Sequence, residues 1–166
     1  MKDQRLEVTA ERQWAMLSYM ICIHGIILGA YYYFYRFSLY IGQLIAYLIF
    51  FLLDACPTLF LHFQYLAANR GTVLLIRPEQ RTVSYTRGAD HFERSFDELD
   101  SILYVTGFGN GAWYSFSEYR YCKLLFKDGR SVVITCLMVK DIKYVMERAF
   151  GMQVTNKTRG IPYIGK

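Results

Sequence analysis

The sequence lacks the short motifs by which catalytic and metal-binding proteins are usually recognised. It contains no glycine-rich nucleotide loop, no nucleophile elbow and no zinc-protease helix signature. His62, His91 and Cys122 do not fall at metal-ligand spacing, and the acidic run DELD at 97–100 is typical of a turn before a strand rather than of a general-acid pair. We therefore expect no enzyme activity, no catalytic residues, no metal and no cofactor.

Cysteine is also scarce, and its spacing excludes two further classes of protein. Cys22, Cys56, Cys122 and Cys136 form no CxxC pair and no Cys/His ladder. Neither a disulfide framework nor a zinc site is indicated.

A formal net charge of +5 would suit a nucleic-acid binder, but the pattern of charge does not. From residue 69 onward, 15 Lys and Arg are interspersed with 10 Asp and Glu, with no basic stripe and no recognition helix. We expect no nucleic-acid partner. Basic loops beside an anionic membrane surface explain the charge more simply.

Charge is almost absent from residues 16–68, where only Arg36 and Asp54 carry it. The run WAMLSYMICIHGIILGAYYYFY has roughly 20 uncharged residues, which matches a hydrocarbon core of about 30 Å. It is too long for the core of a signal peptide and ends in aromatic residues rather than a cleavage site. A second apolar run begins at Leu39 and is longer still. The sequence thus predicts a transmembrane helical hairpin over 14–68.

The positive-inside rule gives the orientation of this hairpin. Lys2, Arg5 and Arg12 precede the first helix and Arg70 follows the second, whereas the short turn contains Arg36. We expect a multi-pass protein of the inner (cytoplasmic) membrane with both termini in the cytoplasm.

Two polar residues in the hairpin are candidate intramembrane sites. Asp54 is an ionisable group near Pro57, and such groups at membrane depth are costly and often functional. It could equally lie at the cytoplasmic interface and be solvated. His24 is a lone imidazole near the middle of the first helix, and by itself it forms no proton relay.

The chain changes character after residue 69, where short strand patterns replace the long apolar runs. TVLLIRP and RTVSYTR flank one turn, and YCKLLF and SVVITC flank the turn KDGR. Apolar residues between Lys140 and Phe150 then recur at helical spacing up to Gly151. We predict four parts: a cytoplasmic N-terminal segment (1–13), the hairpin (14–68), a cytoplasmic domain (69–151) and an extended or poorly ordered tail (152–166).

This layout resembles the bacterial membrane proteins that carry a pleckstrin-homology-like (PH-like) domain after a transmembrane hairpin. The resemblance is carried by TVLLIRPEQRTVSY, FDELDSILYV, YCKLLFKDGRSVVI and VKDIKYVMERAF, which together span roughly residues 72–150. It implies an α+β membrane protein in which the hairpin is followed by an antiparallel β-barrel or sandwich capped by a C-terminal helix. Such scaffolds bind lipid headgroups, peptides or other proteins, and the resemblance implies no catalysis.

Two groups of residues in the domain are candidate binding sites. Arg77, Arg81 and Arg87 in the first hairpin are candidates for a lipid headgroup, with plain solvated surface as the alternative. The glycine-rich segment GFGNGAWYSFSEYRY supplies a candidate partner interface. Its large apolar side chains could also cover the barrel end or rest on the bilayer; they are Phe108, Trp113, Tyr114 and Phe116.

The leading hypothesis is a noncatalytic, membrane-anchored PH-like scaffold that recruits or stabilises a protein or lipid partner at the cytoplasmic face. We expect membrane lipids and a protein partner, or a second copy of the chain, as contacts. One alternative is an immunity or defence component that acts through its hairpin. Another is a subunit of a small oligomeric channel or transporter, suggested by Gly25, Gly29 and Gly42, since small residues let helices pack closely.

Overall fold

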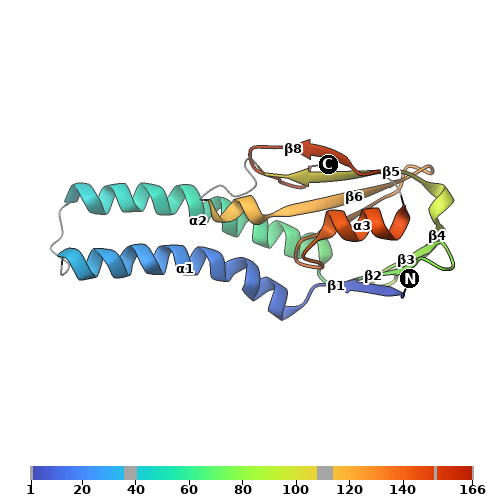
Figure 1. Ribbon diagram of the computed structural model, residues 1–166, viewed down its shortest axis with the longest axis horizontal. Coiled ribbons are helices and arrows are strands. Elements are labelled where there is room, and N and C mark those ends of the chain that lie inside the picture. Colours follow the sequence, from blue (N-terminus) through green and yellow to red (C-terminus); the bar gives the residue numbers. More distant parts are fainter. Residues whose placement is uncertain (1, 36–40, 108–113, 152, 166) are drawn as a thin grey trace.

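The computed structural model describes residues 2–35, 41–107, 114–151 and 153–165. Figure 1 shows a long two-helix hairpin that projects from a domain of sheets and one short helix. The helices of the described part are α1 (Ala10–Tyr35), α2 (Ile41–Asn69) and α3 (Ile142–Phe150), with 3₁₀ helices η1 (Phe96–Glu98) and η2 (Ser115–Glu118). Its strands are β1 (Gln4–Glu7), β2 (Thr72–Arg77), β3 (Thr82–Arg87), β4 (Asp90–Ser95), β5 (Leu99–Thr106), β6 (Arg120–Phe126), β7 (Ser131–Thr135) and β8 (Thr155–Thr158).

The strands form two sheets around one core, which confirms the α+β class. One sheet has the order β1-β2-β3-β4 and the other has the order β7-β6-β5-β8. All neighbours are antiparallel except β5 and β8. Buried and half-buried residues alternate along β2, as expected for a strand with one face on a core. Buried Leu74, Leu124, Ile134 and Met146 bring both sheets and α3 into that core.

The N-terminal segment is part of the first sheet, which differs from the predicted boundaries. In β1, Gln4 lies opposite Ile76 and Glu7 lies opposite Val73 of β2. The hairpin is therefore inserted between the first two strands and does not precede the whole domain. The four residues QRLE offer one apolar side chain, Leu6, so they show no period-2 pattern from which a strand could be predicted.

The C-terminal tail also differs from the predicted one, because it supplies a strand. Thr155–Thr158 runs parallel to β5, with Leu103 opposite Thr155. All four residues of β8 are polar and exposed, which hides it from pattern-based prediction. The predicted end of α3 is observed: Gly151 has a φ of 64°, and its N–H donates to the Glu147 carbonyl.

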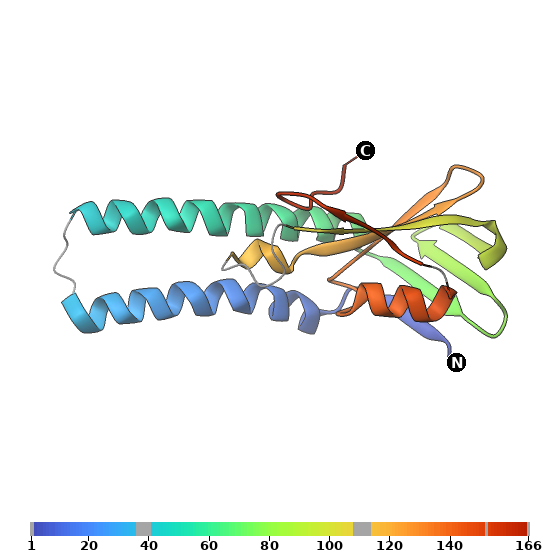
Figure 2. The same cartoon turned by 45° about the horizontal axis from the view of Figure 1, so that its top comes forward.

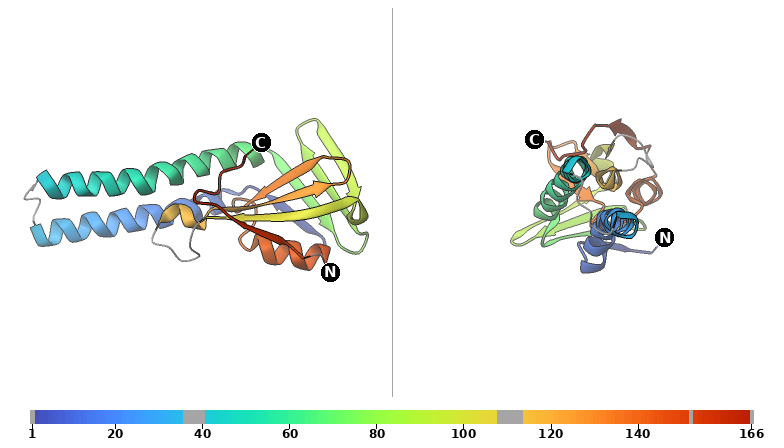
Figure 3. Two further views of the ribbon diagram at one scale, coloured as in Figure 1. Left: turned by 90° about the horizontal axis from the view of Figure 1, so that it is seen from above. Right: turned by 90° about the vertical axis from the view of Figure 1, so that its left-hand side faces the viewer.

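The two long helices expose apolar side chains along most of their length. Both are long and apolar enough to cross a membrane, by length and composition. Figure 3 shows the two helices side by side, with the domain around the start of α1 and the end of α2. The most exposed large side chains of the hairpin include Ile26, Tyr33, Phe34, Ile41 and Phe63. Exposing such a surface to water costs a free energy of about 25 cal/mol per Å² of apolar area.

Candidate functional site

The two candidate polar residues of the hairpin meet at the point where the domain reaches between its helices. Figure 2 shows η2 lying between α1 and α2. The Asp54 side chain is fully buried there, and its Oδ1 accepts the backbone N–H of Ser115 at 2.6 Å. Its Oδ2 accepts the Ser115 hydroxyl at 2.7 Å and lies 3.2 Å from His24 Nε2. We call Asp54, His24 and Ser115 the junction cluster.

Aromatic rings surround the imidazole of the junction cluster. The His24 ring centroid lies 4.9 Å from that of Phe51, 5.5 Å from Phe50 and 6.0 Å from Tyr47. His24 Nδ1 is buried and has no hydrogen-bond partner among the described residues. Burial of the Ser115 N–H and hydroxyl in such apolar surroundings would cost free energy if they had no hydrogen-bond acceptor. The Asp54 side chain accepts both. The solvated position considered for Asp54 is thus not the one it occupies.

The order of the three groups is unlike that of a hydrolase triad. Nucleophile activation requires an imidazole between serine and carboxylate, so that the ring takes the serine proton. In the junction cluster the carboxylate lies in the middle, and the Ser115 hydroxyl donates to Asp54 rather than to His24. The arrangement positions η2 on the helices and does not prepare a nucleophile.

The second half of α2 is joined to the domain by further hydrogen bonds. The Tyr65 hydroxyl donates to the Pro162 carbonyl at 2.6 Å. The Asn69 amide donates to the Val133 carbonyl at 2.7 Å and accepts the Thr135 N–H at 3.1 Å. Leu61 and Tyr65 are also fully buried in the core of the domain. The second half of α2 therefore belongs to the domain, just as its strands do.

A histidine and a tyrosine form one of these links. His62 Nδ1 lies 3.0 Å from the hydroxyl oxygen of Tyr119, which precedes β6. Burial raises the pKa of Tyr119 above its ordinary value, and the neighbouring Cys136 adds to the shift. The phenol therefore stays protonated and can donate to the imidazole.

The three candidate headgroup arginines are not brought to one place. Arg77 lies beside the β2–β3 turn, and Arg87 lies at the opposite end of the same strand pair. Each already has a partner within 2.9 Å, so they do not form a free cationic cluster. These partners are Glu93 for Arg77, Asp97 for Arg81 and the Ala67 carbonyl for Arg87.

The candidate aromatic interface is described only in part. Phe108 and Trp113 lie outside the described residues. Tyr114 is 43% exposed and stacks on Phe116, with ring centroids 5.2 Å apart. The structure thus brings these two rings together at the start of η2, immediately beside the junction cluster.

Sequence reasoning missed a basic pocket of about 360 Å³ at the base of α1. Its charged lining comes from Arg12, Arg120, Lys140 and Glu118, and a Glu118 carboxylate oxygen lies 3.0 Å from Arg120. The three cations of the pocket, Arg12, Arg120 and Lys140, are far apart in sequence, so no local run of positive charge signals the pocket.

A second missed pocket, of about 640 Å³, lies where the C-terminal segment runs beside α2. Phe60, Ile161 and Tyr163 supply aromatic and apolar walls, and Lys157 and Arg159 supply cations. We call this the C-terminal pocket. Aromatic rings beside cations are typical of a membrane interface.

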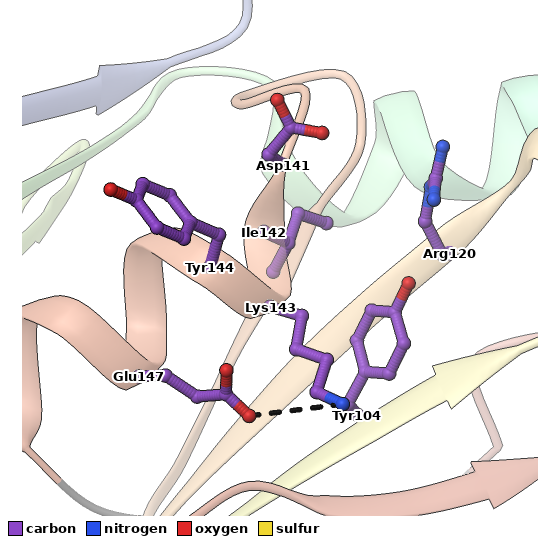
Figure 4. A pocket seen from close by; sticks show the side chains of 7 residues that line it. All are labelled: Tyr104, Arg120, Asp141, Ile142, Lys143, Tyr144 and Glu147. Atoms are coloured by element: carbon purple, nitrogen blue, oxygen red, sulfur yellow. Dashed lines mark ion pairs between the residues drawn. The ribbon is translucent and has the colours of Figure 1, made fainter.

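A third cleft, of about 380 Å³, separates α3 from β5 and β6 (Figure 4). Lys143 and Glu147 pair across one turn of α3 at 3.8 Å. Tyr144 is 59% exposed, and Arg148 donates to its hydroxyl at 2.9 Å. The cleft carries both signs of charge; its lining residues are Tyr104, Arg120, Asp141, Ile142, Lys143, Tyr144 and Glu147.

The fold defines a class: a small α+β domain whose first two strands are connected through a long apolar helical hairpin. The chain belongs to the PH domain family, whose model matches residues 5–144 and so includes the hairpin. Membership indicates a noncatalytic module that binds lipids or proteins. No curated protein and no solved structure matches the chain.

Proposed function

We propose that the chain is a noncatalytic PH module anchored in a bacterial cytoplasmic membrane, with both termini inside the cell, which holds a protein partner at the membrane face. The observation that carries this proposal is the insertion of the apolar hairpin between β1 and β2 of a PH domain. The domain and the hairpin are held together at two points, because α1 follows β1, α2 precedes β2, and these two strands pair with each other.

Membrane insertion supplies a partner for the exposed apolar surface of the hairpin. Lipid chains satisfy this surface, and the helical backbone satisfies its own polar groups. The junction cluster and the α2 contacts then hold the domain at a fixed position relative to the bilayer.

The surface we propose for the protein partner is the cleft beside α3, with Tyr144 and Arg148 at its edge. Tyrosine and arginine are, with tryptophan, the residue types enriched among binding hot spots. The mixed charges of the cleft favour a polypeptide over a phosphate-rich headgroup, which would require several unopposed cations.

Photo-crosslinking in intact cells tests this surface. A photoreactive phenylalanine analogue at Tyr144 should give a discrete higher-mass adduct. The same analogue at Asn156, which is exposed on β8, is the matched control. Equal adduct patterns at both positions, or none at Tyr144, would remove the cleft as the partner site.

The alternatives that act through the hairpin gain no support from Asp54. A residue that lines a pore or meets a toxin needs a free polar group, and both Asp54 oxygens are bonded within the chain. Gly25, Gly29 and Gly42 have open space beside them, so helix packing through these glycines requires a second copy of the chain, as in the oligomeric alternative.

A further inference from the structure

The described part of the hairpin beyond the junction cluster is shorter than the hydrocarbon core of a bilayer. Asp54 comes 13 residues after Ile41, and His24 comes 11 residues before Tyr35. At about 1.5 Å per residue these distances are about 20 Å and about 17 Å, against a hydrocarbon core of about 30 Å. Any tilt of the helices shortens the vertical distance further.

We propose that the end of the domain that carries η2 penetrates the acyl layer of the near leaflet, so that lipid chains contact η2 and the apolar residues of the C-terminal pocket, Phe60 and Ile161. This inference rests on the proposed function, because it requires the hairpin to span the bilayer with its turn at the far surface. The junction cluster then lies inside the hydrocarbon.

The polar groups at the start of η2 suit that depth because they are satisfied by the chain itself, and Glu118 at its end pairs with Arg120 beside the cations at the base of α1. Asp54 accepts both the N–H and the hydroxyl of Ser115. The Ser117 hydroxyl and N–H both donate to the Tyr114 carbonyl, at 2.7 and 3.0 Å, and the Tyr119 N–H donates to the Phe116 carbonyl. Non-helical backbone is tolerated at membrane depth only with such internal partners.

Aromatic and apolar residues lie at the height where the acyl layer should end. Phe60 and Phe63 come 19 and 22 residues after Ile41, or about 29 and 33 Å along α2. Trp14 comes 21 residues before Tyr35, or about 32 Å along α1. Ile161 lines the C-terminal pocket with Phe60, so the C-terminal segment reaches the same height.

Cations accompany this aromatic level on both sides of the hairpin. Lys157 and Arg159 lie beside Ile161 and Tyr163. Arg12 and Lys140 line the pocket at the base of α1. Positive side chains at the phosphate level are attracted to an anionic leaflet. This complementarity favours lipid over a protein partner as the occupant of the surface.

Spin-label accessibility in vesicles containing anionic phospholipid tests the inference on the full-length chain. Single cysteines replace Ile161 and, in a second variant, Phe60, with Cys22→Ala and Cys56→Ala as background; mass spectrometry verifies one label per chain. Leu48, exposed on α2, reports on the hairpin, and Lys127 in the β6–β7 turn is the aqueous control. Collisions with oxygen and with a neutral nickel chelate are compared at each position.

The expected result is that oxygen collisions exceed nickel collisions at positions 48, 60 and 161, with the reverse at 127. Lipid exposure at 48 with water exposure at both 60 and 161 would overturn leaflet penetration and leave the anchor intact. Water exposure at 48 would overturn the proposed function itself. Exclusion of both reagents at 60 and 161 would show that protein covers the surface, which also contradicts the inference.

Discussion

A carboxylate removed from water is stable only when hydrogen-bond donors take the place of the solvent. Asp54 has two donors from Ser115 and the His24 ring beside it, all from elements distant in sequence. The two Ser115 contacts tie η2 to α2, and the His24 contact ties α1 to α2. At the scale of residues, this cluster holds the domain in its position on the helices.

We expect Asp54→Ala to lower the free energy of unfolding in mild detergent by about 1.5–3 kcal/mol, the range for hydrogen bonds to charged groups. Ser115→Ala removes only the hydroxyl and should cost less. The double variant should cost less than the sum of the two, with a coupling energy on the order of 1 kcal/mol. Ser18→Ala, on the exposed face of α1, is the control and should be additive with Asp54→Ala. Additivity of Asp54→Ala and Ser115→Ala would contradict the observed contact.

Asp128 in the β6–β7 turn makes stability depend on acid pH. The Arg130 backbone N–H, followed by the Arg94 side chain, lowers the pKa of Asp128 below its ordinary value. Because the folded pKa is the lower one, its contribution is present above the unfolded pKa and disappears as pH falls through the folded pKa.

Asp128→Asn should therefore reduce stability at neutral pH, and the difference from the parent chain should vanish in acid. Asparagine before Gly129 still suits the hairpin turn, so the substitution isolates the charge. Unfolding midpoints measured across the acid range check this. A difference that does not change with pH would show that the carboxylate charge contributes nothing.

At the scale of elements, β1 joins the N-terminus to the domain through a single buried side chain, Leu6. Leu6→Ala should lower the free energy of unfolding by about 2–4 kcal/mol, as for other buried leucines. Arg5→Ala, on the opposite face of the strand, removes only an exposed ion pair with Glu7 and should change stability by about 0.5 kcal/mol or less. If Leu6→Ala and Arg5→Ala lowered the melting temperature by the same small amount, the N-terminus would lie outside the sheet.

The elements with long or repeated patterns could be predicted from sequence, whereas the short ones could not. The hairpin of α1 and α2 follows from uninterrupted apolar runs, and β2, β3, β6 and β7 follow from alternation around recognisable turns. β1 and β8 have four residues each and are stabilised by their neighbours rather than by their own pattern.

The candidate site shows the same division between local and tertiary information. Asp54 and His24 could be singled out individually, because polar residues are rare in apolar helices. Their partner Ser115 lies 61 residues after Asp54, in a segment where serine carries no signal of its own. The basic pockets likewise join residues from distant elements, such as Arg12 and Lys140.

At the scale of the whole molecule, the hairpin and the sheets form one continuous structure. The helices leave from β1 and return to β2, and the C-terminal segment runs back along α2, where the Gln64 amide and the Ile164 backbone exchange two hydrogen bonds. In the proposed anchored arrangement, a partner bound near α3 is therefore held at a fixed height above the bilayer.

Sidedness labelling of single cysteines tests the anchored domain most directly. Ser38→Cys in the hairpin turn, outside the described residues, and Lys127→Cys in the β6–β7 turn are compared with a membrane-impermeant thiol reagent in intact cells and in inverted vesicles. We expect position 38 to react only in cells and position 127 only in inverted vesicles. Reaction of both positions from the same side would show that the hairpin does not span the membrane, and would contradict a PH domain anchored through it.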